Sequence, residues 1–132
     1  MKKIGWICLG CLIFLAGCSV ERTDMEKIRD VEYTVVEERK VPEVLKEFID
    51  EKMKEPFEIT YGDAGYLYIV KGYGAKDTGG YSIEVLDCFE TTNAVCVKTN
   101  LLGPSEKEEI QEETCPYIVL KIEYSDKNVI LE

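Results

Sequence analysis

The sequence predicts a mainly β domain of the α+β class, a small antiparallel β-sandwich or partly open barrel with one amphipathic helix near its start. Two observations predict this class. From position 57 onward, apolar segments of strand length alternate with clusters of turn residues such as Gly62-Asp63-Ala64-Gly65 and Gly79-Gly80. Upstream of them, a single segment has apolar residues at helical spacing.

The elements are expected in the following order. Residues 31–35 alternate between apolar and polar side chains, as a half-buried strand does. The helix is expected at 42–54, with Pro42 in its first turn and its end before Pro56, and it must cover a sheet face or plug one end. Further strands are expected at 57–61, 66–73, 81–89, 94–101, 116–124 and 128–131.

The chain begins like a bacterial lipoprotein. Lys2 and Lys3 precede an apolar run at 4–16, which ends in Leu15-Ala16-Gly17-Cys18. This run is shorter than the roughly 20 residues that a membrane-spanning helix needs. We therefore expect a signal peptide at 1–17, a lipid on Cys18 that anchors the protein to the outer side of the membrane, a flexible tether at 18–30 and one globular domain at 31–132.

The charge and composition exclude several classes of function. The chain has 16 basic and 26 acidic residues, and loss of the two signal-peptide lysines changes the net charge from −10 to 14 − 26 = −12. Nucleic acid is not an expected partner, because phosphate binding needs a basic surface. The chain has no histidine, the commonest general base and zinc ligand. We expect no cofactor and no metal.

Three cysteines remain after the lipidated one, namely Cys88, Cys96 and Cys115. An odd number cannot pair completely within one chain. Free thiols are favoured, although Cys88 and Cys96 flank a turn and a bond between them stays open. The spacing lacks the C-x-x-C pairs that are typical of a metal site.

The segment 103–114 carries five glutamates and interrupts the strand pattern, so it is expected to be a solvated surface loop. A calcium site is the alternative interpretation of these acids. The segment lacks the D-x-D-x-D-G arrangement of a calcium-binding loop, which argues against that interpretation.

One segment carries a family resemblance. Residues 71–83 read Lys-Gly-Tyr-Gly-Ala-Lys-Asp-Thr-Gly-Gly-Tyr-Ser-Ile, and Gly103-Pro104 and Pro116-Tyr117-Ile118-Val119 follow. Over about 57–131 the chain resembles the C-terminal domain of the PrcB family, bacterial lipoproteins named after a subunit of a protease complex. Asp77 stands where the family usually has proline, and Cys115 where an aromatic residue is common. The resemblance implies assembly with a surface protease, or its stabilisation.

The same residues have a second interpretation from their chemistry alone. The glycines suit tight connections and close backbone approach, which is a purely structural role. The functional alternative is that the loop at 75–81 lies beside the turn at 115–117 and forms a rigid lip for a protein partner. The candidate partner-binding residues are Lys76, Asp77, Thr78, Gly79, Gly80, Tyr81, Pro116 and Tyr117.

We therefore expect a non-enzymatic, lipid-anchored, extracytoplasmic protein-interaction module, with a protease as the partner that the family name suggests. Catalysis would have to depend on the polar cluster of Lys76, Asp77 and Tyr81. Chagasin-like cysteine-protease inhibitors also bind through a T-G-Y-type loop, so inhibition is a further alternative. The last alternative is a structural envelope or sporulation lipoprotein whose acidic surface binds a basic partner or cation.

Overall fold

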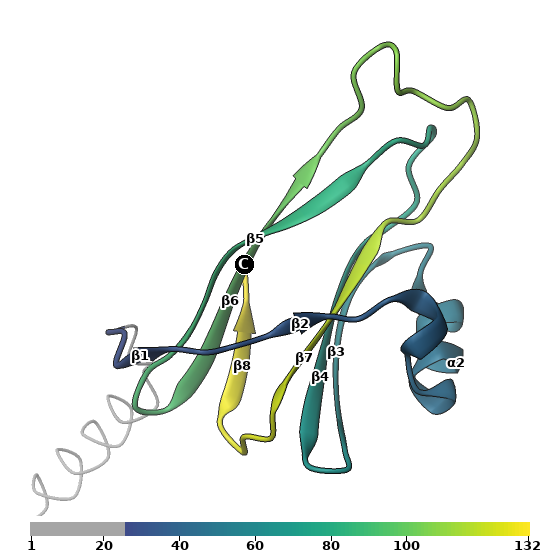
Figure 1. Cartoon of the computed structure of the whole chain (residues 1–132). Helices are drawn as coiled ribbons and strands as arrows, with labels where there is room; N and C mark the ends of the chain where they lie inside the picture. The colour runs from purple at the N-terminus through teal and green to yellow at the C-terminus, as the bar shows by residue number, and fades with distance from the viewer. Residues whose placement is uncertain (1–25) are drawn as a thin grey trace, which may run out of the picture.

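The computed structural model describes residues 26–132. The expected signal peptide, Cys18 and residues 19–25 lie outside this part of the chain. Figure 1 shows two β-sheets and one α-helix packed on the outside of the second sheet. Among residues 26–132, no helix has the length and apolar character needed to cross a bilayer.

Each sheet has four strands. The first has the order β1-β5-β6-β8, and the second has the order β2-β7-β4-β3. The strand bounds are β1 Arg29–Asp30, β2 Thr34–Val35, β3 Pro56–Asp63, β4 Tyr66–Tyr73, β5 Ser82–Glu90, β6 Ala94–Leu102, β7 Tyr117–Glu123 and β8 Asn128–Leu131. The arrangement is sandwich-like and does not close into a barrel, so the sandwich form of the prediction is confirmed.

The helix α2 spans Glu43–Lys52, within the expected segment. A short 3-10 helix, η1 (Glu38–Lys40), precedes it. Leu45 and Ile49 of α2 are fully buried and pack with Val70 of β4 and Val119 of β7. The helix therefore covers the outer face of the second sheet, which is the first of the two positions expected for it.

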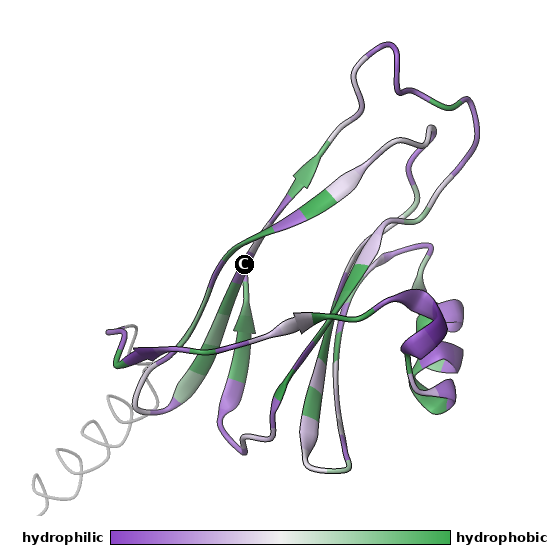
Figure 2. Ribbon diagram, in the orientation of Figure 1, coloured by the Kyte–Doolittle hydropathy of each residue, from purple (hydrophilic) through white to green (hydrophobic). Residues whose placement is uncertain are grey.

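The two faces of the second sheet follow the alternation of its strands. Ile69 of β4 and Leu120 of β7 belong to the core between the sheets, whereas Val70 and Val119 point toward α2. The first sheet contributes Val95 and other apolar residues of β5, β6 and β8 to the same core. Figure 2 shows apolar residues along these strands and polar residues on the exposed side of the helix.

The expected strand at 31–35 is wrong. Arg29 and Asp30 pair with β5 of the first sheet, and Thr34 and Val35 pair with β7 of the second. The chain thus crosses from one sheet to the other within this segment. The local alternation could not reveal this crossing, because hydrogen bonds to two different distant strands decide it. Arg29 and Asp30 also belong to the segment that the sequence assigns to the tether.

The expectation of a wholly antiparallel sheet system is also wrong in one pair. β8 runs parallel to β6, with Ala94 opposite Asn128 and Val97 opposite Leu131. The reason is topological. After β6 the chain enters the second sheet as β7, reverses at residues 124–127 and returns to the first sheet in the direction of β6.

The three cysteines in this part of the chain are free thiols, as the sequence favoured. Cys88 lies in the core between the sheets, opposite Val97. Cys96 lies opposite Phe89 and packs with it in a separate apolar cluster. The two thiols lie on adjacent strands but belong to different apolar clusters.

Candidate functional site

Two long connections lie at one end of the sandwich. The glycine loop, residues 74–81, joins β4 to β5, and the acidic loop, residues 103–116, joins β6 to β7. Figure 1 shows both loops at the end opposite the β3–β4 and β7–β8 turns. We call the two loops together the lip.

Backbone hydrogen bonds join the two loops of the lip. Lys76 and Thr114 exchange a pair of them, with N···O distances of 2.7 and 3.0 Å. The Gly79 N–H donates to the Ile110 carbonyl at 2.7 Å, and the Thr114 hydroxyl donates to the Thr78 carbonyl at 2.7 Å. These bonds constrain the glycine loop against the acidic loop, although the bonded residues are 31 to 38 positions apart in the sequence.

Gly80 has a specific geometric role in the lip. Its φ of +92° is in the left-handed region that favours glycine. A Cβ at this position would lie 2.6 Å from the Glu108 carbonyl oxygen and 2.7 Å from Pro104 Cβ. The absence of a side chain thus lets the acidic loop approach the glycine loop. The predicted positive φ and close backbone approach are therefore confirmed for Gly80.

The structure brings most of the predicted partner-binding residues to the lip. Lys76, Asp77, Thr78, Gly79 and Gly80 follow one another along the glycine loop, and Asp77 is exposed. Tyr81 is half-buried at the end of this loop, and its ring lies near Gly103 of the acidic loop. Pro116 lies at the base of the lip, where its carbonyl accepts a 3.0 Å hydrogen bond from the Tyr73 N–H.

Tyr117 lies elsewhere. It is the first residue of β7 and packs with the apolar cluster beneath α2. Burial, followed by the nearby carboxylates of Glu38 and Asp50, raises the pKa of its phenol. The sequence placed Tyr117 beside the glycine loop because it follows Pro116. The side-chain alternation of β7 directs it to the helix instead.

Two residues of the lip were not among the predicted ones. Thr114 makes three of the hydrogen bonds described above, and Ile110 is 54% exposed near the tip. Ile110 lies over Gly79, where a Cβ would come within 3.2 Å of the Ile110 Cβ. A sequence signal for Ile110 does exist, because it is a large apolar residue surrounded by Ser, Lys, Glu and Gln.

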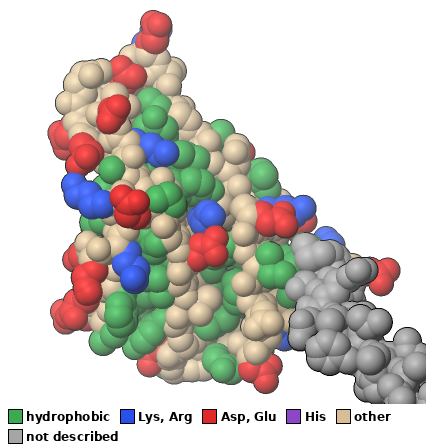
Figure 3. Space-filling model, turned by 180° about the vertical axis from the view of Figure 1, so that it is seen from behind, with side chains coloured by type: hydrophobic (Ala, Val, Ile, Leu, Met, Phe, Trp, Pro, Cys, Tyr) green, Lys and Arg blue, Asp and Glu red, His purple; other side chains and the backbone are tan. Residues whose placement is uncertain are grey.

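The surroundings of the lip are acidic. The acidic loop has five glutamates and one lysine, and Glu113 forms an ion pair with Lys54 at 2.7 Å. This bridge links the lip to the residues that follow α2, and the Ala75 N–H donates to the Lys54 carbonyl at 3.0 Å nearby. Figure 3 shows red acidic side chains at the tip of the molecule.

The two buried cysteines, Cys88 and Cys96, are poorly suited to act as nucleophiles. Burial, with a smaller contribution from Asp87, raises the pKa of Cys88 to about 11. Burial also raises the pKa of Cys96. Both groups are therefore thiols at neutral pH, whereas the reactive nucleophile is the thiolate. No cluster of three or more cysteine, aspartate and glutamate side chains suited to a metal occurs within residues 26–132.

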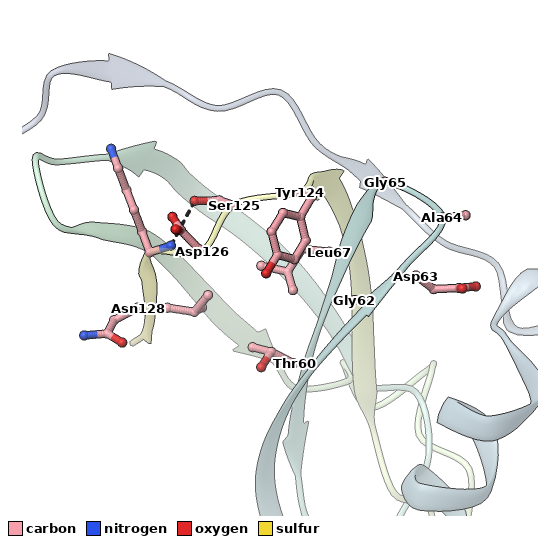
Figure 4. Close-up of a pocket in the computed structure, with 12 residues that line it drawn as sticks. Thr60, Gly62, Asp63, Ala64, Gly65, Leu67, Tyr124, Ser125, Asp126 and Asn128 are labelled. Atoms are coloured by element: carbon pink, nitrogen blue, oxygen red, sulfur yellow. Dashed lines mark hydrogen bonds between the residues drawn. The ribbon is translucent and has the colours of Figure 1, made fainter.

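Two cavities lie at the other end of the sandwich. The smaller, of about 670 Å³, lies between the β3–β4 and β7–β8 turns and is shown in Figure 4. The larger, of about 1270 Å³, lies beneath the crossing segment and includes Tyr33, Tyr66 and Glu90. Tyr124, Ser125, Asp126 and Lys127 line both cavities.

Comparison with known proteins identifies the central part of the chain. Residues 67–123 match the family model described as PrcB C-terminal. The match extends from the second residue of β4 to the end of β7 and includes both loops of the lip. No curated protein and no solved structure matches the chain. Residues 67–123 of this chain therefore form a PrcB C-terminal domain.

Proposed function

We propose that this protein is a non-enzymatic, extracytoplasmic interaction module, anchored to the membrane by a lipid on Cys18, and that its lip binds another protein. The family is named after a protease-complex subunit, and we propose a surface protease as the partner. The observation that carries this proposal is the joining of the two loops of the lip by backbone hydrogen bonds.

Joined loops favour binding because a preformed surface loses little conformational freedom when a partner docks. The lip also presents an apolar side chain to solvent, since Ile110 is 54% exposed and is supported from below by Gly79. An apolar contact surrounded by polar groups has the composition of a small protein interface.

The position of the lip is compatible with a membrane anchor. The described chain enters at the end of the sandwich opposite the lip (Figure 1). The eight residue steps from Cys18 to Glu26 can span at most about 27 Å when fully extended. A lipid on Cys18 would thus keep the β1 end of the domain near the membrane and leave the lip free for a partner.

Absence of catalysis is part of the proposal. It is supported by the lack of histidine in the sequence and by the raised pKa values of the Cys88 and Cys96 thiols. Among the three residues of the catalytic alternative, Asp77 is exposed to water.

A structural envelope role remains the second candidate, favoured by the expected net charge of −12 after signal removal. Such a role would depend on long-range attraction, which salt screens over about 8–10 Å. The inhibitor alternative has less support, because Tyr117 packs beneath the helix and is not presented with the glycine loop.

The proposal is tested by affinity capture from cell envelopes with the full-length chain in detergent. Ile110→Ser should weaken retention of an extracytoplasmic protease by about tenfold. Val44→Ser is the matched control, because Val44 is 50% exposed on α2, away from the lip. Equal retention by Ile110→Ser and wild type would contradict a role of the lip. Capture of basic proteins alone, released by moderate salt, would favour the envelope role.

A further inference from the structure

The smaller cavity at the end opposite the lip is built around one exposed aromatic ring. Tyr124 follows β7, and its side chain is 58% exposed. Figure 4 shows Tyr124 on one side of the cavity, with Leu67 beside it, Thr60 below them, and Asp126 and Asn128 on the other side. The exposed ring offers an aromatic face, with a polar hydroxyl at its edge, to a ligand in this cavity.

The neighbouring backbone holds this ring in place. A Cβ on Gly62 would lie 3.2 Å from Tyr124 Cε1, so the ring rests against the bare α-carbon of this glycine. The Tyr124 N–H donates to the Gly65 carbonyl at 3.0 Å, which ties its backbone to the β3–β4 turn. The tyrosine therefore presents a supported, flat apolar surface at the mouth of the cavity.

The rest of the lining is mostly polar, with Leu67 and Val129 as its larger apolar residues, and it has more acidic than basic side chains. Thr60, Ser125 and Asn128 offer hydroxyl and amide groups, and Asp63 and Asp126 offer carboxylates. Lys127 is the only basic residue of the lining, and its ammonium is bound to the Glu90 carboxylate at 2.9 Å and the Thr91 carbonyl at 2.8 Å. The cavity should therefore repel anionic ligands.

A saccharide matches this combination of groups. One face of a sugar ring carries C–H groups that stack on an aromatic ring, and its hydroxyls exchange hydrogen bonds with amide, hydroxyl and carboxylate side chains. The cavity has a volume of about 670 Å³ and is open to solvent, because most of its lining residues are exposed. Because acidic side chains outnumber basic ones in the lining, the cavity should favour sugars without phosphate or carboxylate groups.

We propose that the cavity beside Tyr124 is a binding site for a neutral or amino-substituted saccharide, with the Tyr124 ring as its stacking surface. Asn128, Thr60 and Asp126 supply the hydrogen bonds. This site is separate from the lip and does not depend on the protein-binding role proposed for it. It gives the domain a second means of attachment in the cell envelope, at the end that a lipid on Cys18 would hold near the membrane.

Saturation-transfer NMR with the full-length chain in detergent tests this site. The neutral probe is N,N′,N″-triacetylchitotriose, and the anionic probe is trigalacturonate. We expect binding of the neutral trimer with a dissociation constant on the order of 1 mM, and no binding of the anionic one. Tyr124→Ala should weaken binding at least about tenfold, and Asn128→Ala by a smaller factor. Phe48→Ala is the control, because Phe48 is 46% exposed on α2 and lines neither cavity.

Three results would overturn the proposal. The first is absence of saturation transfer to the neutral trimer with wild type. The second is equal binding by wild type, Tyr124→Ala and Asn128→Ala. The third is an equal loss for Phe48→Ala and Tyr124→Ala, which would indicate non-specific contact. Asn128 is exposed, so its variant keeps the test valid if Tyr124→Ala does not fold. Ile110→Ser should bind the sugar normally, which separates this result from that for the lip.

Discussion

The ring of Phe57 lies directly over the α-carbon of Gly72 on the neighbouring strand. The two residues are opposite each other in the β3–β4 ladder, and a Cβ on Gly72 would lie only 2.1 Å from Phe57 Cε1. The glycine therefore makes room for an aromatic ring that packs with the cluster beneath α2. This contact secures the edge strand β3 to the rest of the second sheet.

Replacement of Gly72 should be costly. Gly72→Ala would force the Phe57 ring out of its position, and we expect a loss of about 2–3 kcal/mol in the free energy of unfolding. Urea denaturation followed by circular dichroism measures this loss. Gly103→Ala is the control, because a Cβ there would make an ordinary 3.7 Å contact with Tyr81. Equal effects of the two substitutions would contradict the role of the Phe57 ring.

Replacement of Gly80 should open the lip and leave the sandwich folded. An alanine here would be strained at φ +92° and would meet the Glu108 carbonyl oxygen at 2.6 Å. We expect faster hydrogen exchange of the Gly79 amide, which donates to Ile110, and faster cleavage of the acidic loop by a glutamate-specific protease. Gly65→Ala is the control, since its φ is +85° but its surroundings are open. Unchanged exchange at Gly79 in Gly80→Ala would contradict this prediction.

Glu90 should make stability depend on pH. Its side chain is largely buried and accepts hydrogen bonds from Lys127 and Arg29, which hold its pKa below the ordinary value of 4.5. Because the folded pKa is the lower one, this stabilisation is complete above the unfolded value and is lost as pH falls through the folded value. Glu90→Gln should cost about 1–3 kcal/mol at pH 7.

The difference between wild type and Glu90→Gln should shrink as the pH falls below about 4.5. Thermal unfolding from pH 3 to pH 8 measures it. Glu84→Gln is the control, because Glu84 is exposed and accepts a single 3.1 Å bond from Asn100. A difference that is constant across this range would show that the charge of Glu90 does not stabilise the fold.

The thiols should differ in reactivity. Cys115 is partly exposed, whereas Cys88 and Cys96 are buried, and the pKa of Cys88 is raised to about 11. Brief treatment with iodoacetamide at pH 8 should therefore modify Cys115 first and leave the other two intact until urea unfolds the chain. Peptide mapping by mass spectrometry identifies the sites. Early modification of Cys88 in the folded protein would contradict its position in the core.

Local patterns in the sequence determined much of the fold. The bounds of β4 and β8 are those expected, and α2 lies within the predicted segment, because period-2 and helical spacing express which face each element buries. The glycine loop was also identified from its own residues. A left-handed glycine such as Gly80 is a local requirement, and it is visible in the sequence wherever glycines cluster between strands.

The tertiary structure decided what depends on contacts between distant segments. The crossing at residues 29–35, the parallel pairing of β8 with β6, and the bonds from Thr114 and Ile110 to the glycine loop all join segments far apart in the chain. Strand alternation within β7, set by its pairing with β4, turned Tyr117 toward the helix. The cavity beside Tyr124 likewise exists only because two turns from different parts of the sequence meet at one end of the sandwich. A sequence pattern indicates which residues are buried and which lie in turns. Which strands pair with each other depends on contacts between distant segments, and these form only when the whole chain folds.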